Sequence, residues 1–359
     1  MKVLVLTKLK RKGLGSADEY DFINVKKTLE NIKEKNLNID VKFDIFKNYK
    51  NYLIWCPEIV VFLGFDDQYL KIQKIFSTSK TVIWAKCDDL FLNKKFVFFF
   101  KKINFIFDSN FYKKNLPKKF EKKYLYLPTA IHLNYKSTIR EKLLNLLFRK
   151  ILLGQIKKVD IVFSGSPRFN RKDKYRQKLI SILLENKIKV LICAPKNLWM
   201  KSGFFVDDKF KKYLYFSANN SWATPEVYYK AKYVLDLPWL DTIIEDLDNN
   251  YDPQFALGWN ILKAGFYGAN IMTYKCKMNQ ALGLNDNNVN FYKKNILNIS
   301  DLAHEIISIV NSYSSIRAKK KKKLVKTLFR KKHIYSERWN KILYTILNLE
   351  KKICKKNKY

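Results

Sequence analysis

Asp160-Ile-Val-Phe-Ser-Gly-Ser166 is the stretch that decides the fold class. Its first part is a short apolar run of β-branched and aromatic residues, which is typical of a buried strand. Gly165 and Ser166 follow at once, and an amphipathic helical pattern runs over residues 172–186. A strand, a small-residue turn and a helix in this order indicate one unit of a parallel α/β sheet.

The same alternation of strands and helices repeats on both sides of this unit, so the sequence predicts two Rossmann-like parallel-sheet domains. The strands expected in the first half are 3–7, 41–45, 59–64, 81–85, 105–108 and 124–127. Those expected in the second half are 160–164, 190–193, 233–237, 269–274 and 289–292. Further helices are expected over 21–35, 258–267 and 300–311, the last capped by Ser300.

Four segments follow from this pattern. The predicted domains are residues 1–136 and 159–330, and a basic helix over 331–359 is expected to cross back toward the first. Between the domains, residues 137–158 are expected to form a helix with a capping box at Thr138 and Glu141 and a broad apolar face. We favour a helix buried between the domains; an interfacial helix on an anionic membrane is the alternative.

Composition narrows the class of protein. The 359 residues are 47% hydrophobic, enough for two ordinary cores. The most apolar stretch, 96–107, is interrupted by Lys101 and Lys102 and is not expected to span a bilayer. Five scattered cysteines without metal-ligand spacing favour a reduced, cytoplasmic protein, with peripheral association at the inner membrane face left open.

The net charge of +38 has two interpretations. It fits an anionic partner, either a membrane surface or DNA. It also fits compositional drift in an A/T-rich genome, because only nine of the 70 basic residues are arginine. Selection for phosphate or base recognition would favour the planar fork of arginine. Charge alone therefore does not assign a function.

The turn after the deciding strand is a candidate phosphate site. The backbone N–H groups of Gly165 and Ser166 at a helix start, with Arg168 and Arg171 close behind, can bind a diphosphate without a metal ion. An ordinary turn with solvated basic side chains is the alternative interpretation.

Other candidate residues lie near predicted strand ends. Asp88 and Asp89 follow a strand, where parallel sheets place their ligand crevices, and either could act as a general base or simply cap the next segment. Candidates for the first domain's ligand side are Gly13, Gly15 and His132, although an isolated histidine is more often structural. Glu226 is a candidate ligand of the second domain or a first-turn helix acid.

Several stretches together resemble GT-B glycosyltransferases of the spore-maturation-protein type, with a family 1-like C-terminal domain. In the second half these are 160–166 with Arg168, Arg171 and Arg176 behind it, 224–236, 258–269 and His333-Ile-Tyr-Ser-Glu-Arg338. In the first half they are Thr81-Val-Ile-Trp-Ala-Lys-Cys-Asp-Asp89 and Tyr126-Leu-Pro-Thr-Ala130. Phage DNA β-glucosyltransferases are more distantly similar, sharing the layout and a comparable Gly-Ser-x-Arg turn.

The resemblance implies two domains facing across a cleft, with a nucleotide-sugar donor, most readily a UDP-sugar, on the second and the acceptor on the first. It implies that Gly165, Ser166, Arg168, Arg171, Glu226 and Asn260 bind the donor and that Asp88 or Asp89 is the catalytic base. No metal or bound cofactor is implied. Asn260 departs from the family, which usually has a glutamate there to hold the ribose.

Three functions follow as expectations. The first is a hexosyltransferase-type enzyme acting on a surface polysaccharide, lipid-linked or protein acceptor. The second is a phage-type glucosyltransferase that modifies DNA, for which the positive charge would bind phosphates. The third is a non-catalytic GT-B relative, motivated by Asn260.

Overall fold

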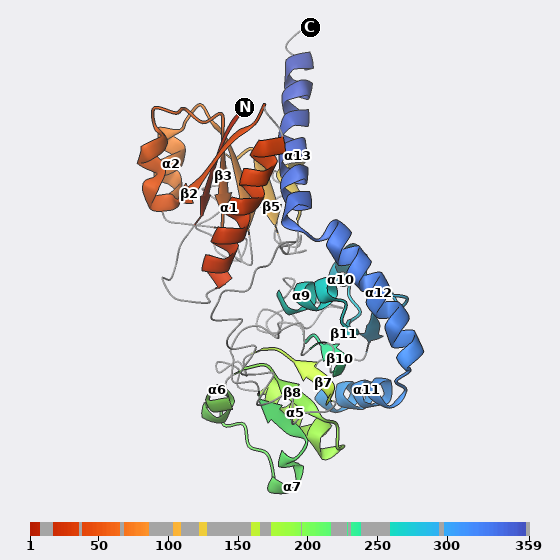
Figure 1. The fold of residues 1–359 in the computed structure, drawn as a ribbon. Coiled ribbons are helices and arrows are strands. Elements are labelled where there is room, and N and C mark those ends of the chain that lie inside the picture. The colour runs from red at the N-terminus through yellow and green to blue at the C-terminus, as the bar shows by residue number, and fades with distance from the viewer. Residues whose placement is uncertain are drawn as a thin grey trace. The chain divides into compact units, whose positions relative to one another are not determined.

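The computed structural model describes the chain in two compact units (Figure 1). Its described residues are 1–7, 17–35, 38–64, 68–85, 103–108, 122–127, 159–165, 174–194, 196–216, 228, 231–237, 259–293 and 298–356. Unit 1 comprises residues 1–135, 254–257 and 332–359, and unit 2 comprises 136–253 and 258–331. The predicted interdomain helix over 137–158 lies outside the described residues.

Unit 1 is built on a parallel six-stranded sheet. Its elements are β1 (Lys2–Thr7), α1 (Ala17–Lys35), β2 (Asp40–Ile45), the 3₁₀ helix η1 (Phe46–Tyr52), β3 (Ile59–Leu63), α2 (Tyr69–Ile75), β4 (Lys80–Ala85), β5 (Phe105–Asp108) and β6 (Tyr124–Tyr126). The order is β2-β1-β3-β4-β5-β6. Strand β2 is added on one side of β1 and β3 on the other, so the strand order reverses between β1 and β3. In Figure 1, α2 covers one face of the sheet and α1 the other.

The last helix of the chain, α13 (Tyr335–Lys356), completes the core of unit 1. The Trp84 ring from β4 is fully buried and packs edge-on against Tyr335 and Trp339, at centroid distances of 6.0 and 5.8 Å. Arg338 donates to Nδ1 of the buried His333 at 2.6 Å and to the Lys332 carbonyl at 2.7 Å. Because arginine can only donate, Nδ1 of His333 is the acceptor. The His333–Arg338 segment thus fixes the start of α13.

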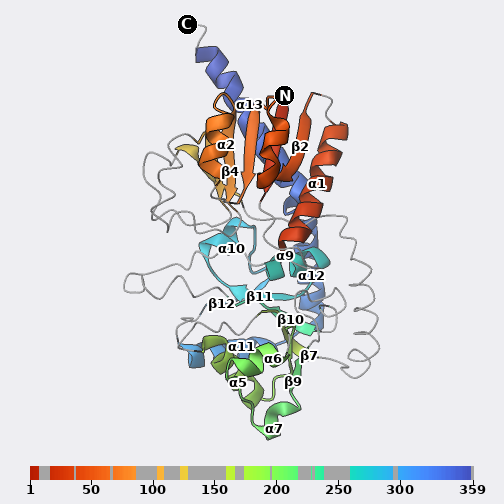
Figure 2. The ribbon, with the colours of Figure 1, turned by 90° about the vertical axis from the view of Figure 1, so that its left-hand side faces the viewer.

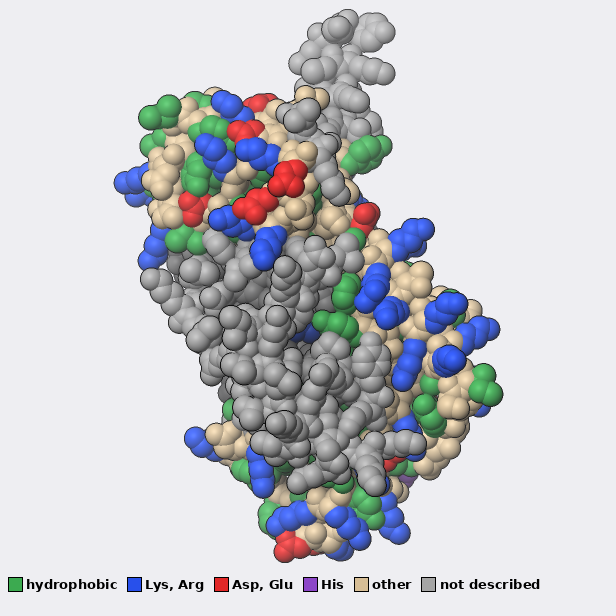
Figure 3. All heavy atoms as spheres, in the orientation of Figure 1, with side chains coloured by type: hydrophobic (Ala, Val, Ile, Leu, Met, Phe, Trp, Pro, Cys, Tyr) green, Lys and Arg blue, Asp and Glu red, His purple; other side chains and the backbone are tan. Residues whose placement is uncertain are grey.

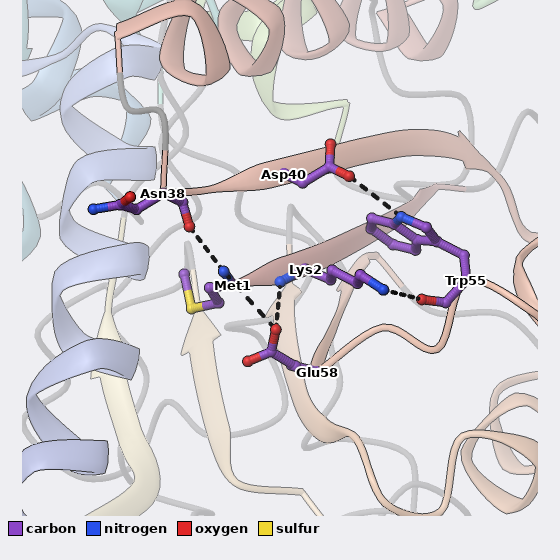
Figure 4. Close-up of polar contacts among 6 residues, drawn as sticks. All are labelled: Met1, Lys2, Asn38, Asp40, Trp55 and Glu58. Atoms are coloured by element: carbon purple, nitrogen blue, oxygen red, sulfur yellow. Dashed lines mark hydrogen bonds and ion pairs between the residues drawn. The ribbon is translucent and has the colours of Figure 1, made fainter.

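Polar contacts close the amino ends of β1, β2 and β3 (Figure 4). The backbone N–H of Lys2 donates to Glu58 at 2.9 Å, and its Nζ donates to the Trp55 carbonyl at 3.2 Å. The Trp55 indole in turn donates to Asp40 at 3.3 Å. Lys33 pairs with Asp40 at 2.7 Å, and this contact, with the bond from Trp55, holds the pKa of Asp40 below its ordinary value despite partial burial. These contacts fix strand register.

Unit 2 is built on a second parallel sheet of six strands. Its elements are β7 (Val159–Phe163), α5 (Tyr175–Glu185), β8 (Val190–Ile192), α6 (Lys196–Lys201), α7 (Asp208–Lys211), β9 (Leu214–Phe216), β10 (Ala231–Leu235), α9 (Trp259–Tyr267), β11 (Ile271–Tyr274), α10 (Lys277–Ala281), β12 (Asn290–Tyr292), α11 (Ile299–Asn311) and α12 (Ser315–Lys332). The order is β12-β11-β10-β7-β8-β9, with β7 and β10 adjacent at the centre. Figure 2 shows α5 and α11 of this unit close together.

One predicted helix start was wrong. The N-cap of α11 is Asn298, whose side chain accepts a hydrogen bond from the backbone N–H of Asp301 at 3.2 Å. Ser300, the predicted cap, already lies inside the helix. Both residue types cap well, and the spacing to Asp301 favours the asparagine.

None of the helices in the described part of the chain combines the length and the hydropathy that a bilayer-crossing segment needs.

Candidate functional site

Most residues predicted for the site lie outside the described part of the chain. Gly165 is fully described, and Asn260 is described as part of the α9 backbone. Outside it lie Gly13, Gly15, Asp88, Asp89, His132, Ser166, Arg168, Arg171 and Glu226. The site must therefore be built from the strand ends that flank these residues.

The order of strands in unit 2 predicts a ligand crevice at the carboxyl ends of β7 and β10. From β7 the chain moves outward to β8 and β9, then returns to β10 on the other side of β7 and continues to β11 and β12. At such a reversal the loops after the two central strands diverge, which opens a crevice at the carboxyl end of the sheet. Gly165 follows β7 at this point, and Asp236 follows β10.

Gly165 lies in a confined turn. Its carbonyl accepts a hydrogen bond from the Trp199 indole at 3.2 Å. A Cβ at this position would lie 3.0 Å from the Phe163 ring and 3.1 Å from a guanidinium nitrogen of Arg176. Both distances are tighter than ordinary contact, so any side chain at position 165 would displace Arg176 or the ring. The glycine lets the backbone turn closely over Arg176.

Arg176 is the cation that the described residues bring to the crevice. It lies in the first turn of α5, and its side chain is only 8% exposed. Its guanidinium carbon lies 5.3 Å from the centre of the Phe163 ring, a cation–π distance. Sequence reasoning noted Arg176 in the resembling stretch but did not include it among the site residues.

Asp236 is a partly buried acid beside the same strand ends. Burial raises the pKa of its carboxyl group, while the hydrogen bond from the Thr273 hydroxyl and the charge of Arg176 act in the opposite direction. The Thr273 hydroxyl donates at 2.8 Å, and the Tyr292 hydroxyl donates to the Asp236 backbone carbonyl at 2.6 Å. The carboxyl group is thus held by β11 and lies in the field of Arg176.

A further amide extends this network. Asn279 of α10 donates to the Thr273 hydroxyl oxygen at 2.9 Å and to the Tyr274 carbonyl at 2.8 Å. Because the Thr273 hydroxyl donates its proton to Asp236, its oxygen accepts the hydrogen bond from Asn279. The hydrogen bonds therefore run in one direction, from Asn279 to Thr273 to Asp236. Sequence reasoning missed all three as site residues, and it placed Asp236 inside the predicted strand 233–237, whereas β10 ends at Leu235.

Asn260 lies at the same edge of the sheet. It is the second residue of α9, which connects β10 to β11. In a parallel sheet the crossover helix starts where the preceding strand ends, so the first turn of α9 lies on the carboxyl side. The backbone thus places residue 260 on the side of Gly165 and Asp236.

Unit 1 has its own reversal, between β1 and β3. The loop with Gly13 and Gly15 follows β1, and Asp88 and Asp89 follow β4, so both pairs come after carboxyl ends of the sheet. In the described part of the chain, no group of three or more His, Cys, Asp or Glu side chains could hold a metal ion.

No protein-family model matches the chain, and no curated protein matches its sequence. Solved structures do match its fold. HepE of Anabaena, crystallised with UDP and glucose, is 10% identical, with a TM-score of 0.61 over 97% of this chain and 100% of that one. A glycosyltransferase from Rickettsia africae is 12% identical, with a TM-score of 0.60 over 96% and 97%. Sucrose-phosphate synthase from Thermosynechococcus elongatus is 8% identical, with a TM-score of 0.56 over 98% and 99%.

These structural similarities cover nearly the whole of this chain and nearly the whole of each matched chain. They confirm the predicted fold class: the protein is an α/β protein of the GT-B fold, with two six-stranded parallel sheets.

Proposed function

We propose that this protein is a glycosyltransferase that uses a nucleoside-diphosphate sugar, with UDP-sugars the expected donors. The observation that carries the proposal is the strand-order reversal between β7 and β10, where a close glycine turn lies over a buried arginine. A diphosphate is a strong anion, and such a turn offers it backbone N–H groups and positive charge. HepE, of similar fold, was crystallised with UDP-glucose, which supports this donor class.

The residues after the turn would make the direct phosphate contacts. Gly165 and Ser166 would offer backbone N–H groups, and Arg168 and Arg171 would make charge-assisted bonds to the diphosphate. Arg176 is a positioning residue, because it packs on Phe163 beneath Gly165 and adds positive potential under the turn. Glu226 and Asn260 are proposed to contact the nucleoside, and Asn260 starts the helix that faces this edge.

Glycosyl transfer then requires one bond to form and one to break. An acceptor oxygen bonds to the anomeric carbon of the sugar, and the bond from that carbon to the diphosphate oxygen breaks, leaving its electron pair on the diphosphate. The positive groups of the turn stabilise that developing charge. If the anomeric centre is inverted, Asp88 or Asp89 takes the acceptor proton. Gly13, Gly15 and His132 are proposed to line the acceptor side.

The acceptor we propose is a surface polysaccharide, a lipid-linked glycan or a protein. GtfA of pneumococcus, described as an O-GlcNAc transferase in complex with UDP and GlcNAc, has a TM-score of 0.51 to this chain and supports glycan chemistry in general. No observation on the described residues favours DNA as the acceptor. A DNA acceptor and a non-catalytic protein are therefore outcomes that the experiment must separate.

Binding of UDP, GDP and CMP, followed by calorimetry at fixed salt, tests the donor site. We expect selective UDP binding, weakened roughly 10- to 100-fold by Arg168→Ala or Arg171→Ala, since each removes a charge-assisted hydrogen bond. The matched control is Arg317→Ala, which removes the same charge from an exposed position of unit 2. Unchanged UDP binding in both site variants would overturn the assignment.

Turnover of UDP-glucose, with release of UDP as readout, then tests the activity. UDP binding without hydrolysis or transfer to any acceptor would favour the non-catalytic alternative. In that case Asn260→Glu is the informative variant, because it restores the carboxylate that related enzymes use. Transfer to duplex DNA but not to glycans would favour the phage-type alternative.

A further inference from the structure

Helix α12 has an inner face that is fully used in packing. Ala318, Val325 and Phe329 are buried against unit 2. Phe329 packs so closely on α9 that a Cβ on Gly265 would lie 2.5 Å from its ring. The position of α12 on unit 2 is therefore fixed by close packing, and its outward side is defined by the same contacts.

Three basic residues of α12 are explained by their surroundings within unit 2. Lys321 donates to the Val289 carbonyl at 2.7 Å and to the Asn290 side chain at 2.8 Å. Burial lowers the pKa of both Lys321 and Lys322. Arg330 donates to the Phe266 carbonyl at 3.3 Å and lies 4.9 Å from its ring centre. Lys321 and the exposed Arg330 therefore have contacts within unit 2, and Lys322 is partly buried.

The outward-facing residues have no such explanation. Of the 18 residues of α12, ten are Lys or Arg and none is acidic. Exposed cations continue along one side of the helix, and Figure 3 shows blue side chains gathered over α12. We call this the α12 basic face: Arg317, Lys319, Lys320, Lys323 and Lys331, with the aliphatic Ile316 and Leu324. Within the described chain, none of its five cations has an acidic ion-pair partner.

We propose that the α12 basic face binds the anionic surface of a lipid bilayer. The face is straight and runs for about 22 Å from residue 316 to 331 at the helical rise of about 1.5 Å per residue. Its charge complements anionic headgroups, and clustered lysines near a membrane add attraction charge by charge. Cations that extend along one side of a helix suit a surface better than a small ligand.

The two aliphatic residues favour a bilayer over a soluble polyanion. Ile316 is 82% exposed and Leu324 is 42% exposed, both among the cations. Leaving such side chains in water has no benefit for a helix that already has its core contacts, whereas an interfacial helix places them at the headgroup boundary. Phosphate recognition on nucleic acid would not require them. The proposal does not depend on the sugar-transfer activity.

Vesicle sedimentation of the full chain tests this proposal, with phosphatidylcholine vesicles and with vesicles that also contain phosphatidylglycerol. We expect binding only to the anionic vesicles. The triple variant Lys319→Gln, Lys320→Gln, Lys323→Gln should lower the partition coefficient about fivefold per charge, hence on the order of 100-fold. Ile316→Ser, which keeps every charge, should lower it severalfold.

The matched control removes three charges elsewhere in unit 2: Lys209→Gln, Lys211→Gln, Lys212→Gln, all at exposed positions in or beside α7. We expect it to keep most of the vesicle binding. Equal losses in the two triple variants would overturn the proposal, because the overall charge of +38 would then explain the binding. An α12 triple variant that loses duplex DNA but keeps vesicles would also overturn it, in favour of a nucleic-acid surface. Thermal melting of each variant separates lost binding from lost folding.

Discussion

The two sheets differ in where their polar side chains lie. In unit 1 polar side chains bridge strands at the amino ends, where Glu58 contacts Lys2, and Gln73 and Asn104 contact Thr81. At the carboxyl end of the edge strand β2, Asp44 accepts local hydrogen bonds from Asn48 at 2.8 Å and from Tyr52 at 2.6 Å. In unit 2, by contrast, Asp236, the buried Arg176 and two further polar side chains lie at the carboxyl ends beside the strand-order reversal. Amino-end contacts tie strands together and need no ligand.

The polar side chains around Asp236 at the carboxyl ends of unit 2 require another explanation. A buried carboxyl group with a raised pKa costs stability near neutral pH, and an apolar residue would pack there at lower cost. Its place beside the strand-order reversal suggests that the cost is offset by function. The comparison teaches that proximity to the strand-order reversal, rather than burial alone, separates structural polar groups from candidate ligand groups.

Trp84→Ala should have the largest effect and tests whether unit 1 depends mainly on its apolar core. The ring is fully buried between β4 and α13, so we expect a loss of about 3–5 kcal/mol in the free energy of unfolding. Urea denaturation measures it. Trp84→Phe is the matched variant and should lose less; equal losses would mean that the indole hydrogen bond to Leu127 matters more than packing.

Arg176→Met should have the next largest effect and tests the polar group of unit 2. It removes the positive charge near Asp236, so we expect a loss of about 2–3 kcal/mol in unfolding free energy and weaker UDP binding. Asp236→Asn in the same chain should recover part of that stability, because no buried acid is then left uncompensated. Additive losses in the double variant would show that the two groups are not coupled.

The effect of Asp236→Asn on the free energy of unfolding should also depend on pH. Burial raises the carboxyl pKa in the folded state, so the folded protein holds this proton to higher pH than the unfolded chain does. The contribution of Asp236 is most favourable below its unfolded pKa, about 3.9, and declines as pH rises through the folded value. The stability of the variant relative to the natural chain should therefore increase from about pH 4 toward neutrality. A constant difference across urea titrations would contradict this.

Glu58→Gln should have the smallest effect and tests the amino-end contacts of unit 1. Glu58 is half-exposed, and glutamine keeps an acceptor for the Lys2 N–H, so we expect a change below about 1 kcal/mol. UDP binding should be unaffected. A large loss of UDP affinity in Glu58→Gln would break the distinction between the two ends of the sheets.

Much of the fold could be predicted from the sequence because buried parallel strands are short apolar runs with clear boundaries. The expected strand 105–108 matches β5, and the expected helix 258–267 differs from α9 by one residue. The edge strand β9 was missed, since Leu214–Phe216 is only three residues long and half-buried. Short helices such as α2 and α6 were missed for the same lack of periodicity.

The site was harder to predict. Gly165 is visible in sequence because a glycine directly after a strand is distinctive. Arg176 is not, because an arginine in the first turn of a helix is ordinarily solvated, and only the fold shows it packed under Phe163. Asp236 was missed because the predicted strand 233–237 included it, whereas β10 ends at Leu235 and leaves Asp236 after the strand.

The return of α13 to unit 1 has a consequence for biosynthesis. Unit 2 is complete in sequence once residue 331 has been made, whereas Trp84 must wait for Trp339, more than two hundred positions later. During synthesis the second unit can therefore finish folding before the first. Until α13 has been made, the Trp84 side chain lacks its contacts with Tyr335 and Trp339. Chains that stop early would expose this apolar surface to chaperones and proteases.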